Sequence, residues 1–476
     1  MAKRKTKIVA TLGPASCDVE TMKQLIAAGM DVARFNFSHG DHREQLGRFL
    51  ALKQAREEMG RPVAALLDTK GPEVRLGRFE GGKAELVPGE RFILTTNDTL
   101  GTSKMASVTY KRLPMDVRTG DVILLDDGNI ELHVRRVCGA EIETEVIDGG
   151  IVSDRKGVNL PGVHLNMPYM SEADEQDILF GIKQGFDIIA ASFVRNADDL
   201  LLLRDFMDKN GGEHMKIIAK IENAEGVENA GEIIRNCDGI MVARGDMGVE
   251  IPLEEVPVQQ KKLIKRGYLA GKQVITATQM LESMIKHPRP TRAEGTDVAN
   301  AIYDGTSAIM LSGETAAGKY PVKAVETMAR IALRTEQDID YKKRFFTESQ
   351  KNHGAENTAD AVSHASCTIS YDLNAAAILA ITKTGTTAKL ISKFRPSIPI
   401  IGCAMTDEVM RQLNLSWNVF PIRLEEKMNM DALFAHAVEK AVETGHVRRG
   451  DLVIITAGIP LGVAGTTNMI KVHVVA

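Results

Sequence analysis

The chain has 476 residues, enough for about three domains of ordinary size. Charged residues make up 26% of it and hydrophobic residues 44%, a balance typical of a globular protein. With 59 Lys and Arg against 63 Asp and Glu, the formal net charge is −4, which excludes a general electrostatic attraction to nucleic acid or to an anionic membrane. Any anionic ligand must therefore be held by a local cluster of cations.

The five cysteines lie at least 36 residues apart, and their number is odd. No CxxC pair occurs, which argues against a disulfide framework or a zinc ribbon. The basic start MAKRKTK is followed by an apolar run that stops at Gly13-Pro14, too short for a signal peptide. No stretch reaches the roughly 18 apolar residues of a membrane span. We expect a cytoplasmic protein with reduced thiols and no membrane segment.

From residue 5 to 70, short apolar runs alternate with helical patterns. A helical stretch opened by Ser16 and Asp18, both good N-cap residues, follows the first run, and another is predicted over 41–59. The apolar runs are KIVATLG (7–13), VARFNFS (32–38) and VAALLDT (63–69). Residues 71–167 show gapped, alternating strands with Gly turns instead. They predict a small all-β insert of the barrel or sandwich kind.

After Pro168 the strand–helix alternation returns with five more apolar runs, at 186–193, 215–222, 238–246, 272–279 and 306–314. Three runs before the insert and five after it make eight β/α units over about 250 residues, the number that a closed (β/α)₈ barrel needs. An open doubly wound sheet can use the same pattern, and counting strands does not separate the two.

A third region follows the charged, turn-rich stretch FTESQKNHGAEN (346–357). It has the composition of an α/β domain with a mostly parallel sheet and its last strand at an edge. Its apolar runs are at 375–382, 398–403, 419–422, 451–458 and 469–476. The predicted domains are a barrel formed by 1–70 and 168–345, the insert 71–167, and a C-terminal domain 346–476.

Polar side chains lie at the ends of six predicted barrel strands, where the active sites of such barrels are found. One charged group there is readily explained by a rim salt bridge, but independent salt bridges have no reason to concentrate at successive strand ends. The residues are Arg34, Asn36, Ser38, Asp68, Thr69, Lys220, Glu222, Arg244, Asp246, Thr278, Ser312 and Glu314.

The side chains of these residues are suited to binding a metal ion and anionic groups. Glu222 and Asp246 are hard carboxylates suited to Mg²⁺. The cations Arg34, Arg75, Lys156, Lys220 and Arg244 suit phosphate and carboxylate oxygens. No His stands at a strand end beside a Ser or Cys, which argues against acyl transfer. His39 is the one His in a catalytic position, and it is equally well explained as a loop residue ahead of a helix.

With these residues in view, the chain resembles the pyruvate kinase family over essentially its whole length. Segments at 7–16, 33–40, 67–75, 156–162, 216–228, 238–252, 276–284 and 310–321 carry the resemblance, and IAKIEN, MVARGD and TATQMLESM are its most specific parts. It implies a (β/α)₈ barrel, a β-barrel insert after the third strand, and a C-terminal α/β regulatory domain. It also implies transfer of the phosphoryl group of phosphoenolpyruvate to ADP, giving ATP and pyruvate in the last step of glycolysis.

The resemblance assigns roles to residues of this chain. Lys220, Thr278, Arg34 and Arg75 are implied as catalytic, and Gly245 and Asp246 as further contacts of phosphoenolpyruvate. Glu222 and Asp246 are implied as ligands of Mg²⁺ or Mn²⁺, and His39, Arg75 and Lys156 as nucleotide contacts. The implied K⁺ ligands are Asn36, Ser38, Asp68 and Thr69. A need for K⁺ is also expected because Asp68 and Glu73 leave that site short of positive charge.

The resemblance further implies a homotetramer and a sugar-phosphate activator, fructose 1,6-bisphosphate or ribose 5-phosphate. The activator loop would be Thr382, Lys383, Thr384, Gly385, Thr386 and Thr387, a hydroxyl-rich turn at a predicted helix N-terminus. A plain N-cap turn is the alternative explanation. We expect Gly465-Thr466-Thr467-Asn468 to close the same pocket or to form a turn, and Trp417 to report effector binding. A metal-dependent lyase that uses phosphoenolpyruvate or pyruvate on the same barrel is the alternative function.

Overall fold

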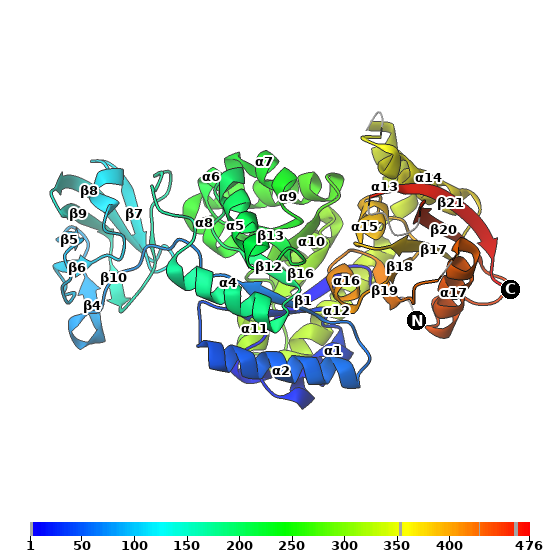
Figure 1. Ribbon diagram of the computed structural model, residues 1–476. Helices are drawn as coiled ribbons and strands as arrows, with labels where there is room; N and C mark the ends of the chain where they lie inside the picture. The colour runs from blue at the N-terminus through cyan, green and yellow to red at the C-terminus, as the bar shows by residue number, and fades with distance from the viewer. Residues whose placement is uncertain (1–2, 352–354, 428, 461–464) are drawn as a thin grey trace.

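The computed structural model describes residues 3–351, 355–427, 429–460 and 465–476. Figure 1 shows three parts in a row, with the insert at one end, the barrel in the middle and the C-terminal domain at the other end. No helix among the described residues is both long enough and apolar enough to cross a bilayer.

Eight parallel strands close into a barrel in the order β1-β16-β15-β14-β13-β12-β3-β2, which confirms the (β/α)₈ architecture. Strand β1 closes the ring by pairing with both β2 and β16. The strands are β1 (Lys7–Thr11), β2 (Val32–Asn36), β3 (Ala64–Asp68), β12 (Ile188–Ala191), β13 (Lys216–Ile221), β14 (Gly239–Ala243), β15 (Gln273–Ala277) and β16 (Ala308–Leu311).

Helices surround the barrel, and several begin at a side chain that accepts a backbone N–H. Asp18, rather than Ser16, caps α1 by accepting the Thr21 N–H at 2.8 Å. The helices are α1 (Val19–Ala28), α2 (His42–Glu58), α4 (Glu172–Gln184), α5 (Ala197–Lys209), α6 (Ala224–Glu228), α7 (Ala230–Asn236), α8 (Arg244–Glu250), α9 (Val256–Leu269), α10 (Arg292–Asp304), α11 (Gly313–Ala316) and α12 (Pro321–Asp338). Short 3₁₀ turns are η1 (Pro14–Ser16), η3 (Leu253–Glu255) and η4 (Glu282–Ile285).

Alternation along the strands separates a barrel interior from the layer under the helices. Ile218 lies in the interior, while Ile217 and Ala219 of the same strand pack under the helices. The interior cluster also contains Leu415, a residue of the C-terminal domain. That domain therefore helps to fill the base of the barrel.

The insert leaves the barrel after β3 and returns before α4, and it has a hydrophobic core of its own. A curled six-stranded sheet has the order β11-β7-β8-β9-β5-β6, beside a two-stranded sheet of β10 and β4. The elements are η2 (Glu80–Gly82), β4 (Lys83–Leu86), β5 (Arg91–Thr95), β6 (Met105–Ser107), α3 (Leu113–Asp116), β7 (Val122–Leu125), β8 (Ile130–Cys138), β9 (Glu141–Asp148), β10 (Gly150–Ser153) and β11 (Val158–Asn159).

The C-terminal sheet has the order β19-β18-β17-β20-β21 and is mostly parallel with its last strand at an edge, as predicted. That edge strand, β21, is antiparallel to β20. The stretch 346–357, predicted to be turn-rich, is helical as far as Lys351. The elements are α13 (Tyr341–Lys351), α14 (Thr358–Asp372), β17 (Ala377–Thr382), α15 (Thr386–Lys393), β18 (Ile400–Ala404), α16 (Asp407–Leu413), β19 (Val419–Arg423), α17 (Met430–Glu443), β20 (Leu452–Gly458) and β21 (Thr467–Val474).

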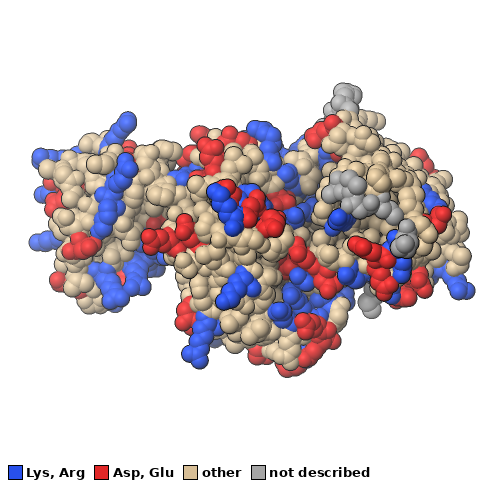
Figure 2. Space-filling view, viewed as in Figure 1, with Lys and Arg blue, Asp and Glu red and all other residues tan. Residues whose placement is uncertain are grey.

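The C-terminal domain contacts the barrel at the amino ends of the barrel strands. Lys7 Nζ donates to the Val419 carbonyl at 2.6 Å, and the buried Asp187, just before β12, accepts from Arg411 Nε at 2.7 Å. The carboxyl ends face the insert instead (Figure 1). On the face drawn in Figure 2, acidic and basic side chains are interspersed over all three parts.

Candidate active site

Lys220 stands at the carboxyl end of β13 with three oxygen partners around its ammonium group. Its Nζ lies 3.0 Å from Asp68 Oδ1, 2.9 Å from Glu222 Oε1 and 2.8 Å from Ser192 Oγ. The other oxygen of Asp68 lies 2.6 Å from Arg34 Nε. The closed barrel thus brings together side chains from β2, β3 and β13 that are far apart in the sequence.

The charges in this cluster stabilise one another. Burial lowers the pKa of Lys220, but the charges of Asp68 and Glu222 outweigh burial and hold that pKa above its ordinary value. Burial raises the pKa of Asp68, and the charges of Arg34 and Lys220 reverse this and leave it lowered. Lys220 therefore stays an ammonium ion, and Asp68 a carboxylate, at neutral pH.

Ser192, directly after β12, is a site residue that the sequence reasoning missed. Its hydroxyl accepts from Lys220 Nζ and donates to the Thr69 carbonyl at 2.6 Å, so it connects the lysine to the end of β3. The residue was detectable, because it is the polar group at the end of the fourth barrel strand.

Glu222 and Asp246, at the ends of adjacent strands, have the properties expected of ligands for a divalent cation. Glu222 is buried; one of its oxygens meets Lys220, and the other accepts the Phe193 N–H at 2.8 Å. Burial and the neighbouring charges of Asp246 and Asp68 outweigh Lys220 and raise the pKa of Glu222 to about 8. The Asp246 carboxylate accepts no hydrogen bond from the described part of the chain. A divalent cation would relieve this crowding of negative charge.

Thr278 closes the site beside β14 and β15. Its backbone φ is 69°, a left-handed value that is rare for a β-branched residue. The Gly245 N–H donates to Thr278 Oγ1 at 2.8 Å. Arg244, which the sequence suggested as an anion-binding cation, instead pairs with Asp297 at 2.7 Å and donates to the Thr278 carbonyl. Arg244 therefore supports the Thr278 loop.

A cavity of about 550 Å³ lies between the insert and the barrel mouth. His39, Arg75, Lys156 and Asp246 all line it. Arg75 pairs with Glu73 at 2.6 Å, and Lys156 pairs with Asp126 at 2.6 Å. The structure thus brings the three predicted nucleotide contacts to one cavity.

Comparison with known proteins decides the family. A family model described as the pyruvate kinase barrel domain matches residues 3–325, and one for the pyruvate kinase alpha/beta domain matches residues 360–473. The chain belongs to the pyruvate kinase family. By this membership it is an enzyme, a phosphotransferase.

Relatives named pyruvate kinase match almost the whole chain. The protein from Sporosarcina psychrophila is 51% identical over 99% of this chain and 80% of its own length. That from Clostridium acetobutylicum is 48% identical over 99% of this chain and 100% of its own. A crystal structure of a pyruvate kinase from Cryptosporidium parvum is 40% identical, with a TM-score of 0.94 over 99% of this chain and 96% of its own.

The oxygens assigned to K⁺ by family resemblance lie around the ends of β2 and β3. Asn36 Oδ1 accepts the Ser38 N–H at 3.0 Å, and Thr69 Oγ1 accepts the Ser192 N–H at 3.1 Å. Asp68 pairs with Arg34 and Lys220, and Glu73 pairs with Arg75. The expected need for K⁺ stays a prediction. Among the described residues, no group of three or more His, Cys, Asp or Glu side chains is placed to hold a metal ion.

In the C-terminal domain, residues 382–387 run from the last residue of β17 into the first turn of α15, and all of them except Gly385 line a pocket of about 250 Å³. Thr466 and Thr467 line the same pocket, and Thr467 Oγ1 lies 2.7 Å from Thr387 Oγ1. Trp417 does not line it. Its ring lies instead 5.3 Å from that of Tyr341 and is buried, so the expected reporter of this loop belongs to another part of the domain.

Proposed function

We propose that this enzyme transfers the phosphoryl group of phosphoenolpyruvate to ADP, giving ATP and pyruvate. The observation that carries the proposal is the buried Lys220 ammonium, held by Asp68, Glu222 and Ser192 beside Arg34 at the barrel mouth. A fixed positive charge at this point offsets charge on the transferring phosphoryl group, which is the main task in such a reaction.

The other assigned residues bind and orient phosphoenolpyruvate. Arg34 and Arg75 hold its phosphate, while the backbone N–H groups of Gly245 and Asp246, with Thr278, receive its carboxylate. The Gly245 N–H now donates to Thr278 Oγ1, and substrate binding exchanges that contact for the carboxylate. The enolate is protonated by Thr278 or by a water beside it, near Ser312 and Glu314.

Glu222 and Asp246 would hold Mg²⁺ or Mn²⁺. When bound, this ion supplies a Lewis acid for the carboxylate and phosphoryl oxygens of the substrate. Asn36, Ser38, Asp68 and Thr69 would hold K⁺, and this assignment rests on their oxygens and on the family resemblance. ADP would lie against His39, Arg75 and Lys156, and the insert would close over it as a lid.

Three further proposals concern the whole protein. The loop 382–387 binds a sugar phosphate, such as fructose 1,6-bisphosphate or ribose 5-phosphate, which activates the enzyme. The active protein is a homotetramer, and it works in the cytoplasm. The pocket shared by Thr384, Thr386 and Thr467 supports the first of these.

A coupled assay for pyruvate tests the proposed reaction directly. Pyruvate should form from phosphoenolpyruvate only when ADP and Mg²⁺ are both present, and faster with K⁺ than with Na⁺. A lyase on the same barrel would release pyruvate without ADP. Formation of pyruvate at an equal rate without ADP would refute phosphoryl transfer.

A further inference from the structure

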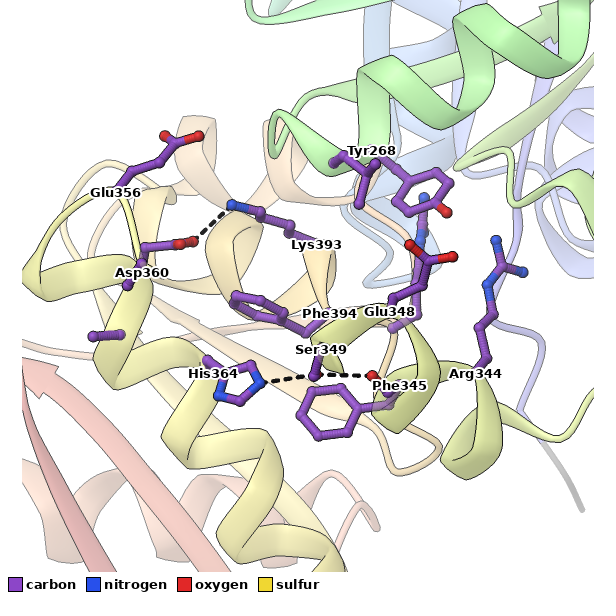
Figure 3. Close-up of a pocket in the computed structure, with 14 residues that line it drawn as sticks. Tyr268, Arg344, Phe345, Glu348, Ser349, Glu356, Asp360, His364, Lys393 and Phe394 are labelled. Atoms are coloured by element: carbon purple, nitrogen blue, oxygen red, sulfur yellow. Dashed lines mark hydrogen bonds and ion pairs between the residues drawn. The ribbon is translucent and has the colours of Figure 1, made fainter. Parts of the chain in front are cut away.

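A second large cavity, of about 760 Å³, lies between the barrel and the C-terminal domain. Figure 3 shows its wall, built from the end of α9, from α13 and α14, and from residues 393–395 at the end of α15. It shares no lining residue with the active-site cavity or with the pocket at 382–387. The proposed reaction leaves this cavity without a role.

Arg395, one of the lining residues, is a buried cation with incomplete hydrogen bonding. Only 5% of the residue is exposed. Its Nη2 donates to the Gly305 carbonyl at 2.8 Å and to Ser307 Oγ at 3.2 Å. Its Nε and Nη1 find no acceptor in the described part of the chain. Its guanidinium also forms no ion pair with any described residue.

Arg344 brings a second positive charge to the same place. The guanidinium carbons of Arg344 and Arg395 lie 5.3 and 5.4 Å from the centre of the Tyr268 ring. Arg344 donates only to the carbonyls of Tyr303 and Asp304, at 3.3 Å each, and it too forms no ion pair with a described residue. Burial and the charge of Arg344 lower the pKa of Arg395 to about 9.

The acidic residues of the cavity do not compensate these charges. Asp360 pairs with Lys393 at 2.8 Å, and Glu348 lies 3.7 Å from Lys265. Glu356, the third acidic lining residue, forms no ion pair with Arg344 or Arg395. A buried charge without a counter-ion is costly, and it is retained where it serves a ligand. Guanidinium groups match the oxygens of phosphate and carboxylate in both charge and geometry.

We propose that this cavity is an anion site that takes the phosphate or carboxylate group of a small metabolite. Arg344 and Arg395 bind the group beside Tyr268. Because Tyr268 belongs to the barrel and Arg395 to the C-terminal domain, the bound anion contacts both. The site is separate from the activator loop, so the two can be occupied independently.

The chain contains a reporter for this site. Trp417 is its single tryptophan, and the Arg395 guanidinium carbon lies 4.7 Å from the centre of its ring. The purified full-length protein is titrated with inorganic phosphate, and separately with citrate, at constant ionic strength while Trp417 fluorescence is measured. We expect a saturable change with at least one anion, and the anion that produces it identifies the group that the site prefers.

Four variants make the test specific. Arg344→Gln, at a half-buried position, should weaken binding at least tenfold. Lys343→Gln, its exposed neighbour on α13, should bind like the parent protein. Thr384→Ala with Thr386→Ala should leave the response unchanged. Arg395→Gln, if it folds, should abolish the response. The proposal is overturned if neither anion produces a saturable change, if Arg344→Gln titrates like the parent, or if the double threonine variant loses the response.

Discussion

Phe193, like Thr278, has a left-handed backbone, with φ near 52°. This conformation costs of order 1–3 kcal/mol for a residue with a side chain. Here it directs the Phe193 N–H to Glu222, whereas the conformation of Thr278 places its hydroxyl against the Gly245 N–H. At the scale of single residues, the barrel mouth therefore holds strained positions that orient the groups assigned to substrate and metal.

Lys220→Met should lower kcat by several orders of magnitude while the affinity for phosphoenolpyruvate stays within about tenfold. The ammonium offsets charge that is redistributed during phosphoryl transfer. Removing it therefore destabilises mainly the transition state. Rapid-mix kinetics and substrate binding measure the two effects separately. A kcat near the parent value would show that Lys220 takes no part in the reaction.

Glu222→Gln and Asp246→Asn should each raise the half-saturating Mg²⁺ concentration at least tenfold, because each removes an anionic ligand. The pKa of Glu222 is raised to about 8 in the metal-free protein, so below that pH protons compete with the metal for this carboxylate. The Mg²⁺ requirement should therefore fall as pH rises from about 6.5 to 8.5.

Activity at several Mg²⁺ concentrations and pH values measures both effects. Glu222→Gln has no proton to lose at this position and should show a flatter pH dependence than the parent. Equal metal titrations in the parent and in both variants would mean that the divalent cation binds elsewhere.

At the scale of elements, two contacts between side chains join the insert to the barrel among the described residues, and the Arg195 guanidinium also donates to the carbonyls of Leu165 and Met167. Asn159 Nδ2 of β11 donates to Glu250 Oε1 at the end of α8 at 2.9 Å, and His164 Nδ1 lies 2.9 Å from Glu225 Oε2 of α6. Helix α8 also carries Asp246, so the first contact links the insert to the proposed metal ligand. Both contacts border the cavity assigned to the nucleotide.

Asn159→Ala should raise the KM for ADP by up to about fivefold, since one hydrogen bond contributes about 1 kcal/mol to the closed lid. The KM for phosphoenolpyruvate should change little, because the residues assigned to it, apart from Arg75, lie on the barrel. Asn97→Ala, at an exposed position of the same insert, is the matched control. Steady-state kinetics that show equal ADP constants in both variants would contradict a role for this contact.

The sequence predicted the helices and strands better than it predicted which side chains contact one another. The eight barrel strands were recognisable because they are buried on both faces and are therefore mainly apolar, most clearly in β16. Polar residues at their ends indicated the site. The contacts of Arg244 with Asp297 and of Arg75 with Glu73 were not predictable from the sequence, because they depend on how the loops approach one another in three dimensions. The helical part of 346–357 was missed because its composition is charged and rich in turn formers.

At the scale of the whole molecule, the C-terminal domain lies at the opposite end of the barrel from the insert (Figure 1). Several polar side chains cross this junction, including Arg411 to Asp187 and Gln273 to Ser416. The pocket at 382–387 thus belongs to a domain attached to the amino ends of the barrel strands. Binding there can change activity only if it favours one arrangement of the molecule over another.

Thr384→Ala with Thr386→Ala should abolish activation by a sugar phosphate and leave the unactivated rate unchanged. In the parent, the activator should lower the half-saturating phosphoenolpyruvate concentration with little change in kcat. Thr444→Ala, outside this pocket, is the control. If the double variant responds to fructose 1,6-bisphosphate and ribose 5-phosphate like the parent, the loop is only a structural turn.

The pairing of β1 with β16 sets an order of events during synthesis. Lys7 pairs with Ala308, so a ribosome must make about 300 residues after β1 before the ring can close. At about 5–20 residues per second this takes roughly 15–60 s. The insert has its own core and can fold in that interval. During the same time β1 has no β16 to pair with. Leu415, which fills the barrel base, emerges later still. The first strands of the barrel are thus the part of the nascent chain most in need of protection from wrong partners.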